Sequence, residues 1–267
     1  MKRSRLAPIV ILWAAASLIG LAQAAPAWVD TYESRLEMLA LTQTLNAEIL
    51  ASTSATSTLE KWCGDHKMAD DPRIVARAIA GADKVPAPEQ LQRLHVASAG
   101  EVKYRHVELR CGSHVLSEAD NWYVPGRLTP EMNNVLETTE APFGRVVRPL
   151  QPYRRTFAVT LLWSPLPAGW EQQLRPKKPS RGKARPLVLP KELFEHRAVL
   201  YTGDHQPFAE VNERYQGQLL AFTPVPHKSI DVWKQDQWKL FDLMNDRSEL
   251  HNLNGGVDGP AARSRGQ

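Results

Sequence analysis

The sequence predicts an α+β fold in which helices flank a single antiparallel β-sheet. Helix signals come first along the chain, near residues 30–50, whereas most later segments alternate apolar and polar residues with a period of two. Short turns separate these later segments, as expected for hairpins that place antiparallel strands side by side. With 43% hydrophobic residues and eight tryptophans in 267 residues, the chain can also form a core of domain size.

The N-terminus has the pattern of a secretory signal peptide over residues 1–24. A basic stretch at residues 2–5 precedes an apolar run at 7–21, and Ala-Gln-Ala at 22–24 gives the small residues of a cleavage site. The alternative is an uncleaved anchor, but the run is short against the roughly 20 residues of a membrane span. We therefore expect a periplasmic or secreted protein with no membrane segment after cleavage.

The net charge of +4 does not indicate a nucleic-acid-binding protein. Of the 33 basic residues, three lie in the leader and six in the segment 175–185, while the chain has 29 acidic residues. Outside these two segments acidic residues exceed basic ones, so no basic face is expected. The basic segment belongs to a Pro-rich stretch, residues 164–190, which we predict to be a surface loop that is either solvated or bound to a partner.

Two helix signals open the mature chain. Asp30 is expected to cap a helix over residues 30–50. Ser57, with Glu60 three residues later, forms a second capping box and predicts a short helix that continues to Cys63. No element is predicted within residues 70–100, where prolines interrupt the pattern.

The strands are predicted from residue 102 onward. Residues 102–111 and 115–124 alternate around a Gly-containing turn, and further strand-like runs occupy 154–163, 195–202 and 207–215. Between them, Thr129 as N-cap and proline at the first helical position predict a helix to about residue 137. The final stretch, 254–267, is expected to be disordered, which leaves one domain over residues 25–253.

The chain has no motif for a metal, a cofactor or a serine nucleophile. Gly-rich phosphate loops, HExxH and GxSxG are absent, and the eight histidines lack metal-ligand spacing. We therefore predict no metal and no cofactor. The two cysteines, Cys63 and Cys111, fit either one disulfide in an exported protein or two buried thiols.

Three features are candidates for binding or catalysis. Arg105 lies on the apolar face of a strand and needs an anion there, either an internal carboxylate or a ligand. The turn at 142–145 offers backbone N–H groups and an arginine fork, unless it is an ordinary turn with a solvated arginine. Glu210 and Glu213 lie on opposite faces of one strand, so at most one points inward as a general acid; both could equally be surface carboxylates.

Taken in order, these segments resemble the chorismate pyruvate-lyase family, whose fold group includes effector domains of bacterial transcription regulators. Ser54-Ala55-Thr56 resembles an early helix start, with Ala55 where a ligand-contacting Met is usual. The strand YRHVELRCG resembles the one that carries the carboxylate-binding arginine, here Arg105. Ala-Pro-Phe-Gly-Arg, residues 141–145, resembles Thr-Pro-Leu-Gly-Arg, and the segment 213–215 resembles the strand with the catalytic carboxylate.

The resemblance implies a single antiparallel sheet with flanking helices and a cofactor-free elimination of pyruvate from chorismate to give 4-hydroxybenzoate. It implies Glu213 and Arg105 as catalytic residues, with Glu210 as the fallback carboxylate. It implies ligand contacts from a backbone amide at Phe143 and from Gly144 and Ala55. Asp120 and Asn121 stand where the family has Gly-Arg, so Asn121 is expected at the ligand and Asp120 brings a negative charge beside it.

Three functions remain open at this stage. The first is an exported chorismate-lyase-like enzyme. The second is a periplasmic module that binds a small aromatic carboxylate without catalysis, which the acidic Asp120 favours. The third is a structural envelope protein with a vestigial pocket. The partner expected in the first two is a small aromatic carboxylate and not a nucleic acid; the sequence leaves the oligomeric state open.

Overall fold

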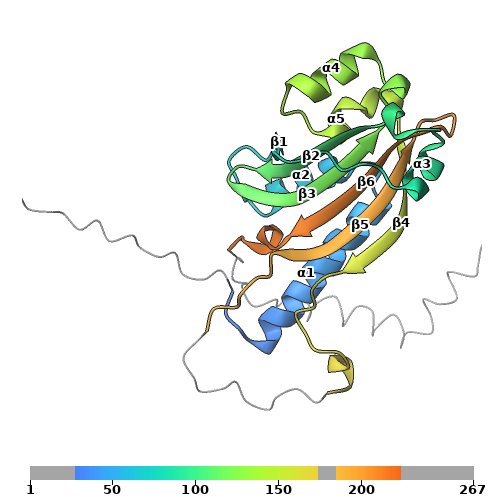
Figure 1. Cartoon of the computed structure of the whole chain (residues 1–267). Coiled ribbons are helices and arrows are strands. Elements are labelled where there is room, and N and C mark those ends of the chain that lie inside the picture. The colour runs from blue at the N-terminus through green and yellow to red at the C-terminus, as the bar shows by residue number, and fades with distance from the viewer. Residues whose placement is uncertain (1–27, 174–184, 224–267) are drawn as a thin grey trace, which may run out of the picture. The chain divides into compact units, whose positions relative to one another are not determined.

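The computed structural model describes residues 28–173 and 185–223 and confirms the predicted α+β class (Figure 1). Six strands form one antiparallel sheet in the order β1-β2-β3-β6-β5-β4. Their bounds are Ile74–Ala78 (β1), Lys103–Cys111 (β2), His114–Tyr123 (β3), Tyr153–Leu161 (β4), Glu192–Tyr201 (β5) and Pro207–Gln216 (β6). The predicted strands are therefore all present, with ends shifted by a few residues.

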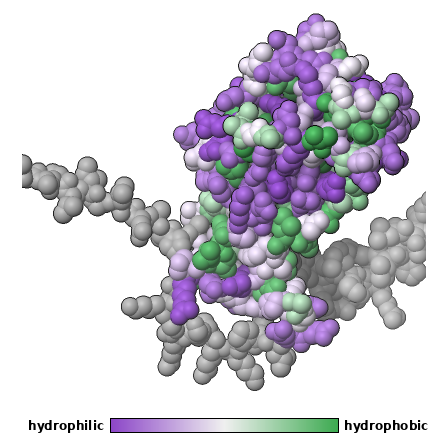
Figure 2. Space-filling view, viewed as in Figure 1, coloured by the Kyte–Doolittle hydropathy of each residue, from purple (hydrophilic) through white to green (hydrophobic). Residues whose placement is uncertain are grey.

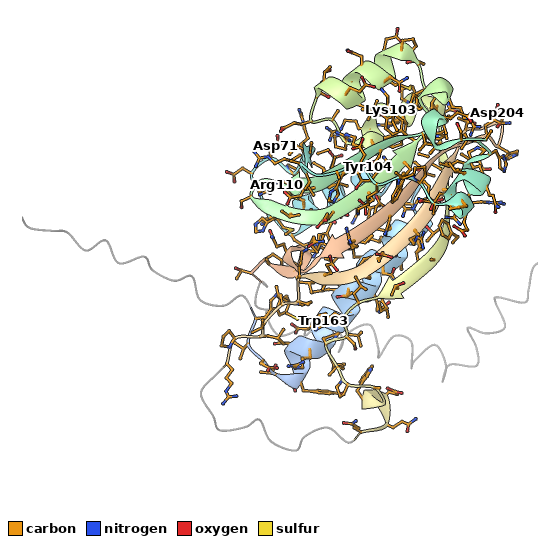
Figure 3. The ribbon with its side chains drawn as sticks, in the orientation of Figure 1. Asp71, Lys103, Tyr104, Arg110, Trp163 and Asp204 are labelled. Atoms are coloured by element: carbon orange, nitrogen blue, oxygen red, sulfur yellow. A yellow bond between two sulfur atoms is a disulfide. The ribbon has the colours of Figure 1, made fainter. Side chains whose placement is uncertain are left out.

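Among the described residues, five α-helices flank the sheet. They are Tyr32–Ala51 (α1), Ala55–Asp65 (α2), Pro88–Leu94 (α3), Pro130–Thr138 (α4) and Phe143–Val146 (α5). In Figure 1 the helices α1 and α2 lie behind the sheet, while α4 and α5 lie at its upper end. The turn between β5 and β6, which holds Asp204, is also at that end, and Trp163, after β4, is at the lower end (Figure 3).

Two apolar clusters cover the face of the sheet that we call the inner face. In one, Met38 and Ile49 of α1 and Trp62 of α2 pack with Phe194 and Tyr215 of the sheet. In the other, helices α4 and α5 pack on β5 and β6. All five side chains named are almost fully buried, and each such burial contributes about 1.5–3 kcal/mol. The two clusters meet the sheet at different ends, and the candidate site lies between them.

The opposite face, which we call the outer face, carries charged side chains from the central strands. Glu210, Asn212 and Arg214 of β6 alternate with the inner residues, and Glu118 and Asp120 of β3 are their cross-strand neighbours. The surface over β3 and β6 in Figure 2 is accordingly mostly hydrophilic. Because successive side chains of a strand point to opposite faces, this alternation decides which carboxylates can reach the inner side.

Cys63 and Cys111 form a disulfide, the first of the two alternatives left open by the sequence. The bond joins α2 to the end of β2, and both cysteines are fully buried. It therefore fixes the helix whose N-terminus reaches the candidate site to the strand that forms part of the site's floor.

The N-cap residues predicted for the first two helices are both wrong, Asp30 by one residue and Ser57 by three. Thr31, rather than Asp30, caps α1, because its hydroxyl accepts a hydrogen bond from the Ser34 amide at 3.1 Å. Asp30 instead forms an ion pair with Arg35 at 2.7 Å. Likewise α2 begins at residue 55 and is capped by Ser54. The predicted cap at Thr129 is confirmed.

The segment 70–100 holds two elements that the sequence did not predict. Strand β1 has five residues at the edge of the sheet, too few for a clear alternation. Helix α3 begins with Pro88, so a residue that reads as an interruption is the helix's first residue. Similarly, the predicted turn at 142–145 opens into the short helix α5.

Several predictions concern residues outside those described: the leader at 1–24, the tail at 254–267 and the basic segment at 175–184. The extent of the domain to residue 253 therefore stays a prediction. In the part of the chain that is described, no helix is both long and apolar enough to cross a membrane.

Candidate functional site

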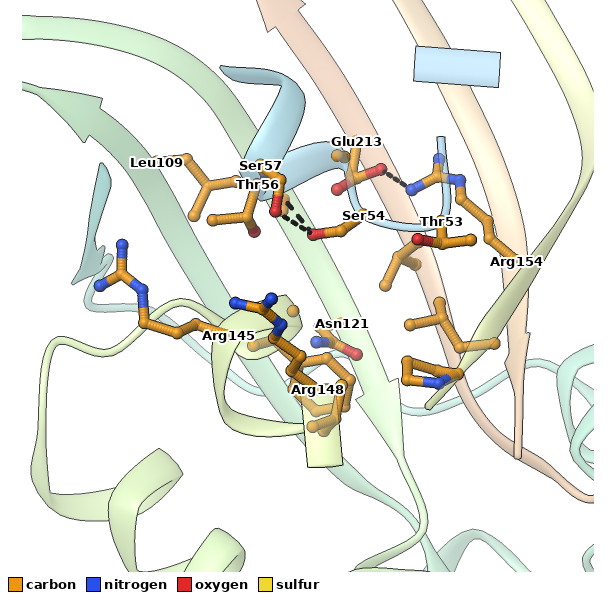
Figure 4. Close-up of a pocket in the computed structure, with 18 of the residues that line it drawn as sticks. Thr53, Ser54, Thr56, Ser57, Leu109, Asn121, Arg145, Arg148, Arg154 and Glu213 are labelled. Carbon is orange, nitrogen blue, oxygen red and sulfur yellow. Dashed lines mark hydrogen bonds and ion pairs between the residues drawn. The ribbon is translucent and has the colours of Figure 1, made fainter. Parts of the chain in front are cut away.

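A cavity of about 540 Å³ lies on the inner face between the two apolar clusters (Figure 4). Its floor is apolar and comes from the sheet, through Val107, Leu109, Ala119, Val211 and Leu200. Its walls come from residues 53–57 at the start of α2 and from residues 143–152 in and after α5. A concave site with an apolar floor and a few polar groups is the usual form of a small-molecule pocket.

Arg154 and Glu213 form a buried ion pair on one side of the cavity. Arg154 Nη1 donates to Glu213 Oε2 at 2.5 Å, and the Tyr215 hydroxyl donates to the same oxygen at 3.1 Å. The Arg154 side chain is only 6% exposed. Although burial opposes its charge, Glu213 raises the pKa of Arg154. The pair therefore holds a permanently charged guanidinium at the cavity wall.

The second terminal nitrogen of Arg154 is left without a partner. Nη2 is buried and makes no hydrogen bond within the described residues. A buried charged donor without an acceptor costs free energy, commonly more than the 1–3 kcal/mol of a neutral group. An anion that accepts from Nη2 would remove this cost, and the Arg154 side chain is one of those that line the cavity.

Asn121 provides a second unsatisfied group in the same cavity. Its side chain projects from β3, it is 3% exposed, and Oδ1 is buried without a hydrogen-bond partner among the described residues. In the register of β3 and β6, Asn121 pairs with Val211, two residues before Glu213. Diagonal neighbours of this kind lie roughly 7–8 Å apart, so Asn121 lies near Glu213, the carboxylate that holds Arg154.

The remaining charges give the cavity an excess of one positive charge. Three arginines line it, Arg145, Arg148 and Arg154, against two carboxylates, Glu60 and Glu213. Arg145 is paired with Glu60. Among the described residues, Arg148 has no carboxylate within salt-bridge distance. An anionic ligand is thus favoured over a neutral or cationic one.

Gly144 and Phe143 bring α5 close to the start of α2. A Cβ on Gly144 would lie 3.0 Å from Thr56 Oγ1 and 3.2 Å from Ser54 Oγ, so only glycine allows this approach without displacement. The Phe143 ring is buried against Tyr123 and Phe208, and it anchors the helix. As the first residue of α5, Phe143 has a backbone N–H without an acceptor in the helix.

Five of the predicted site residues therefore line one cavity: Ala55, Asn121, Phe143, Gly144 and Glu213. The family resemblance implied them, and the antiparallel sheet brings them together. Ala55 lies beside Ser54, whose hydroxyl bonds with that of Ser57 (Figure 4).

Arg105 is not among the residues that line the cavity, which corrects its predicted role. It lies on the inner face, opposite Asn121. Its Nη2 donates to the Ala141 carbonyl at 3.2 Å. Within the described residues no carboxylate lies within salt-bridge distance of Arg105, and its Nη1 is buried without a hydrogen-bond partner. Burial lowers the pKa of Arg105, and its contact supports the loop that leads into α5.

Glu210 is excluded as the fallback carboxylate because it faces the outer side. The prediction that Glu210 and Glu213 lie on opposite faces is confirmed by their cross-strand partners, Trp122 and Ala119. Arg93 of α3 binds both carboxylate oxygens of Glu210, at 2.7 and 2.8 Å. The role of Glu210 is therefore to attach α3 to the sheet.

Asp120 also points to the outer face, so its charge is not beside the cavity. Both of its oxygens accept from Lys84 at 2.7 Å, and the Tyr104 hydroxyl donates to one of them at 2.5 Å. Burial opposes ionisation, but these hydrogen bonds outweigh it and lower the pKa of Asp120. The acidic residue that was expected to favour binding over catalysis therefore does not act on the site.

Sequence reasoning missed Arg154, Arg148 and the hydroxyl groups of the α2 start. Arg154 is followed directly by Arg155, and both belong to the predicted strand 154–163. Strand alternation requires that one of them points inward, but not which one. The sequence therefore contained a signal for an inward arginine without identifying it.

Comparisons with known proteins find several similar solved structures and a relative in sequence. No family model matches the chain. The crystal structure of PhnF from Mycobacterium smegmatis has a TM-score of 0.36 at 17% identity, covering 59% of this chain and 64% of that one. The PhnF effector domain has a TM-score of 0.38 at 15% identity, covering 62% and 89%.

The ligand-binding domain of a putative GntR-family transcriptional regulator from Bordetella bronchiseptica has a TM-score of 0.34 at 15% identity, covering 54% of this chain and 82% of that one. In sequence, the chain is 48% identical over 201 residues to the uncharacterized protein y4mC of Sinorhizobium fredii (strain NBRC 101917 / NGR234), which covers 74% of this chain and 83% of y4mC. The chain therefore belongs to the same family as y4mC.

Proposed function

We propose that this protein binds a small aromatic carboxylate in the inner-face cavity, and that its main role is binding and not catalysis. The single observation that carries the proposal is Arg154 Nη2, a charged donor that is buried at the cavity wall and has no acceptor among the described residues. Glu213 fixes the guanidinium through Nη1, which leaves Nη2 as the unpartnered donor of a charged side chain that lines the cavity.

The ligand's other end is matched by Asn121. Its unpartnered Oδ1 can accept from a ligand hydroxyl, and the apolar floor between the two positions suits a ring. A ring with a carboxylate at one end and a hydroxyl at the other, as in 4-hydroxybenzoate, satisfies both groups. Satisfying two buried polar atoms also gives specificity, since an analogue that lacks either group leaves one unpaired.

The alternative is a chorismate lyase, favoured by the position of Glu213 in the cavity. A lyase would need this carboxyl as a proton donor to the breaking ether. Glu213 Oε2 already accepts from both Arg154 and Tyr215, an arrangement that suits an anchor for Arg154 more than a donor. Incubation of the protein with chorismate separates the two: formation of 4-hydroxybenzoate would overturn the non-catalytic proposal.

The binding test is calorimetric titration with 4-hydroxybenzoate of the protein and of its Arg154→Lys variant. Lysine keeps the ion pair with Glu213 but removes Nη2. We expect at least about tenfold weaker binding, the equivalent of one charge-assisted hydrogen bond. The matched control is Arg155→Lys, at the neighbouring exposed arginine of the same strand, which should bind as the parent does.

The comparison of the two variants decides the result. Equal affinity for Arg154→Lys and the parent would contradict the assignment of Nη2 as the carboxylate donor. No measurable binding of 4-hydroxybenzoate, benzoate or chorismate by the parent protein would contradict the proposed ligand class and favour a structural role.

We also propose that the protein acts in the periplasm or outside the cell. The pattern of the leader at residues 1–24 supports this, and so does the Cys63–Cys111 disulfide, because such bonds persist in oxidising compartments. Fractionation of cells that produce a C-terminally tagged chain tests it. Recovery in the cytoplasmic fraction with both thiols reduced would contradict it.

A further inference from the structure

Strand β4 is an open edge of the sheet with an apolar surface. It is the last strand in the sheet order, and within the described residues its backbone pairs with β5 alone. Of the nine large apolar side chains that are exposed in the described residues, four follow one another here. These are Phe157, Val159, Leu161 and Leu162, which are 43% to 53% exposed.

The other edge of the sheet is protected. Strand β1 is shorter, the amide of Ala76 donates to the carbonyl of Glu140 at 2.8 Å, and Arg145 donates to the carbonyl of Ile74. Natural proteins commonly cover or charge their sheet edges, because unpaired backbone groups recruit other strands. Residues 156–163, TFAVTLLW, contain neither a charge nor a proline, so β4 has no such protection.

We propose that β4 pairs antiparallel with β4 of a second copy of this chain, forming a two-fold dimer with a continuous sheet. The charge pattern favours this occupant and this direction. Along the chain, the charged residue nearest to the apolar run is Arg155, at one end of it, and Arg93 and Arg197 lie over the Phe157 ring. An antiparallel pairing centred on Val159 places the two Arg155 residues about 26 Å apart along the strands, whereas parallel pairing would bring them together.

The proposed dimer is also a closed assembly, to which no further copies can add. Each chain has one free edge among its described residues, since β1 is covered, so one two-fold contact uses both free edges and leaves none for further copies. The pairing would satisfy the outward backbone groups of β4 and place its exposed apolar side chains beside those of the partner strand. Because Arg154 belongs to β4, the contact would also stiffen the strand that carries the proposed carboxylate donor.

The test is sedimentation velocity of the full mature chain and of its Val159→Lys variant. The parent is expected at twice the chain mass, and lysine at the centre of the contact should weaken self-association at least about tenfold, by placing two like charges opposite each other. The control is Val75→Lys, an exposed valine of the other edge strand, which should stay dimeric. Leu161→Lys serves as a second variant should Val159→Lys fail to fold.

Hydrogen exchange completes the test. The β4 amides of the parent should exchange more slowly above the dimerisation concentration than below it, and those of Val159→Lys should not depend on concentration. A monomeric parent would overturn the proposal. Protected β4 amides in that monomer would show that another part of the same chain covers the edge, and unprotected amides would leave it free for a different partner. A Val159→Lys variant that remains as dimeric as the parent would also overturn it.

Discussion

Removing the Cys63–Cys111 disulfide is expected to lower the free energy of unfolding by about 4 kcal/mol. The two cysteines are 48 residues apart in sequence. Closing a loop of that length in the unfolded chain removes entropy worth roughly 4 kcal/mol at 25 °C in the chain-entropy treatment of cross-links. For a domain with a total stability of about 5–15 kcal/mol, this is a large fraction.

The measurement is urea unfolding of the parent, of the reduced parent and of the Cys63→Ala/Cys111→Ala double variant. Reduction removes the cross-link without removing atoms, so it isolates the loop term, while the double variant adds the loss of two buried sulfurs. Adding reductant to the double variant should change nothing. The slope of the unfolding free energy against urea concentration should be smaller for the cross-linked parent than for the reduced protein, because the cross-linked unfolded state is more compact.

The expected loss also has a local consequence at the cavity. The bond fixes α2, whose first residues form one wall, to β2, which contributes Val107 and Leu109 to the floor. Reduction should therefore weaken 4-hydroxybenzoate binding as well as stability. A loss of stability below about 1 kcal/mol on reduction would refute the reasoning, because it would mean that the bond constrains the unfolded chain little.

Two further predictions concern single residues at or below the cavity. Burial and the charge of Arg154 lower the pKa of His196 to about 4, and its Nδ1 has no hydrogen-bond partner in the described part. Between pH 6.5 and pH 4 this histidine binds a proton in the unfolded state but not in the folded state. The free energy of unfolding should therefore fall as the pH is lowered from 6.5 to 4, by up to roughly 3 kcal/mol. In unfolding titrations at several pH values, His196→Gln should reduce this dependence on pH. Gly144→Ala should weaken 4-hydroxybenzoate binding several-fold, because its Cβ displaces Thr56, with stability changed by less than about 1 kcal/mol. Gly126→Ala, with open space around it, is the control, and equal affinities in the two calorimetric titrations would contradict the close approach of α5 and α2.

Much of the fold follows from local patterns. The alternation in residues 102–124 and 207–215 is a property of neighbouring residues, and it predicted both strands and the opposite faces of Glu210 and Glu213. Thr129 with the following proline similarly predicted α4. The short elements were missed because five residues of β1 carry too little alternation to be recognised.

The sequence, through its resemblance to a known family, predicted that five residues from four distant segments belong to one candidate site, and Ala55, Asn121, Phe143, Gly144 and Glu213 line one cavity. Only the tertiary structure decided which arginine serves the cavity. An arginine side chain extends across neighbouring strands, so its target depends on the sheet order and not on its own segment. Arg154 reaches over β5 to Glu213 of β6, whereas Arg105, on the same face, turns to the Ala141 carbonyl.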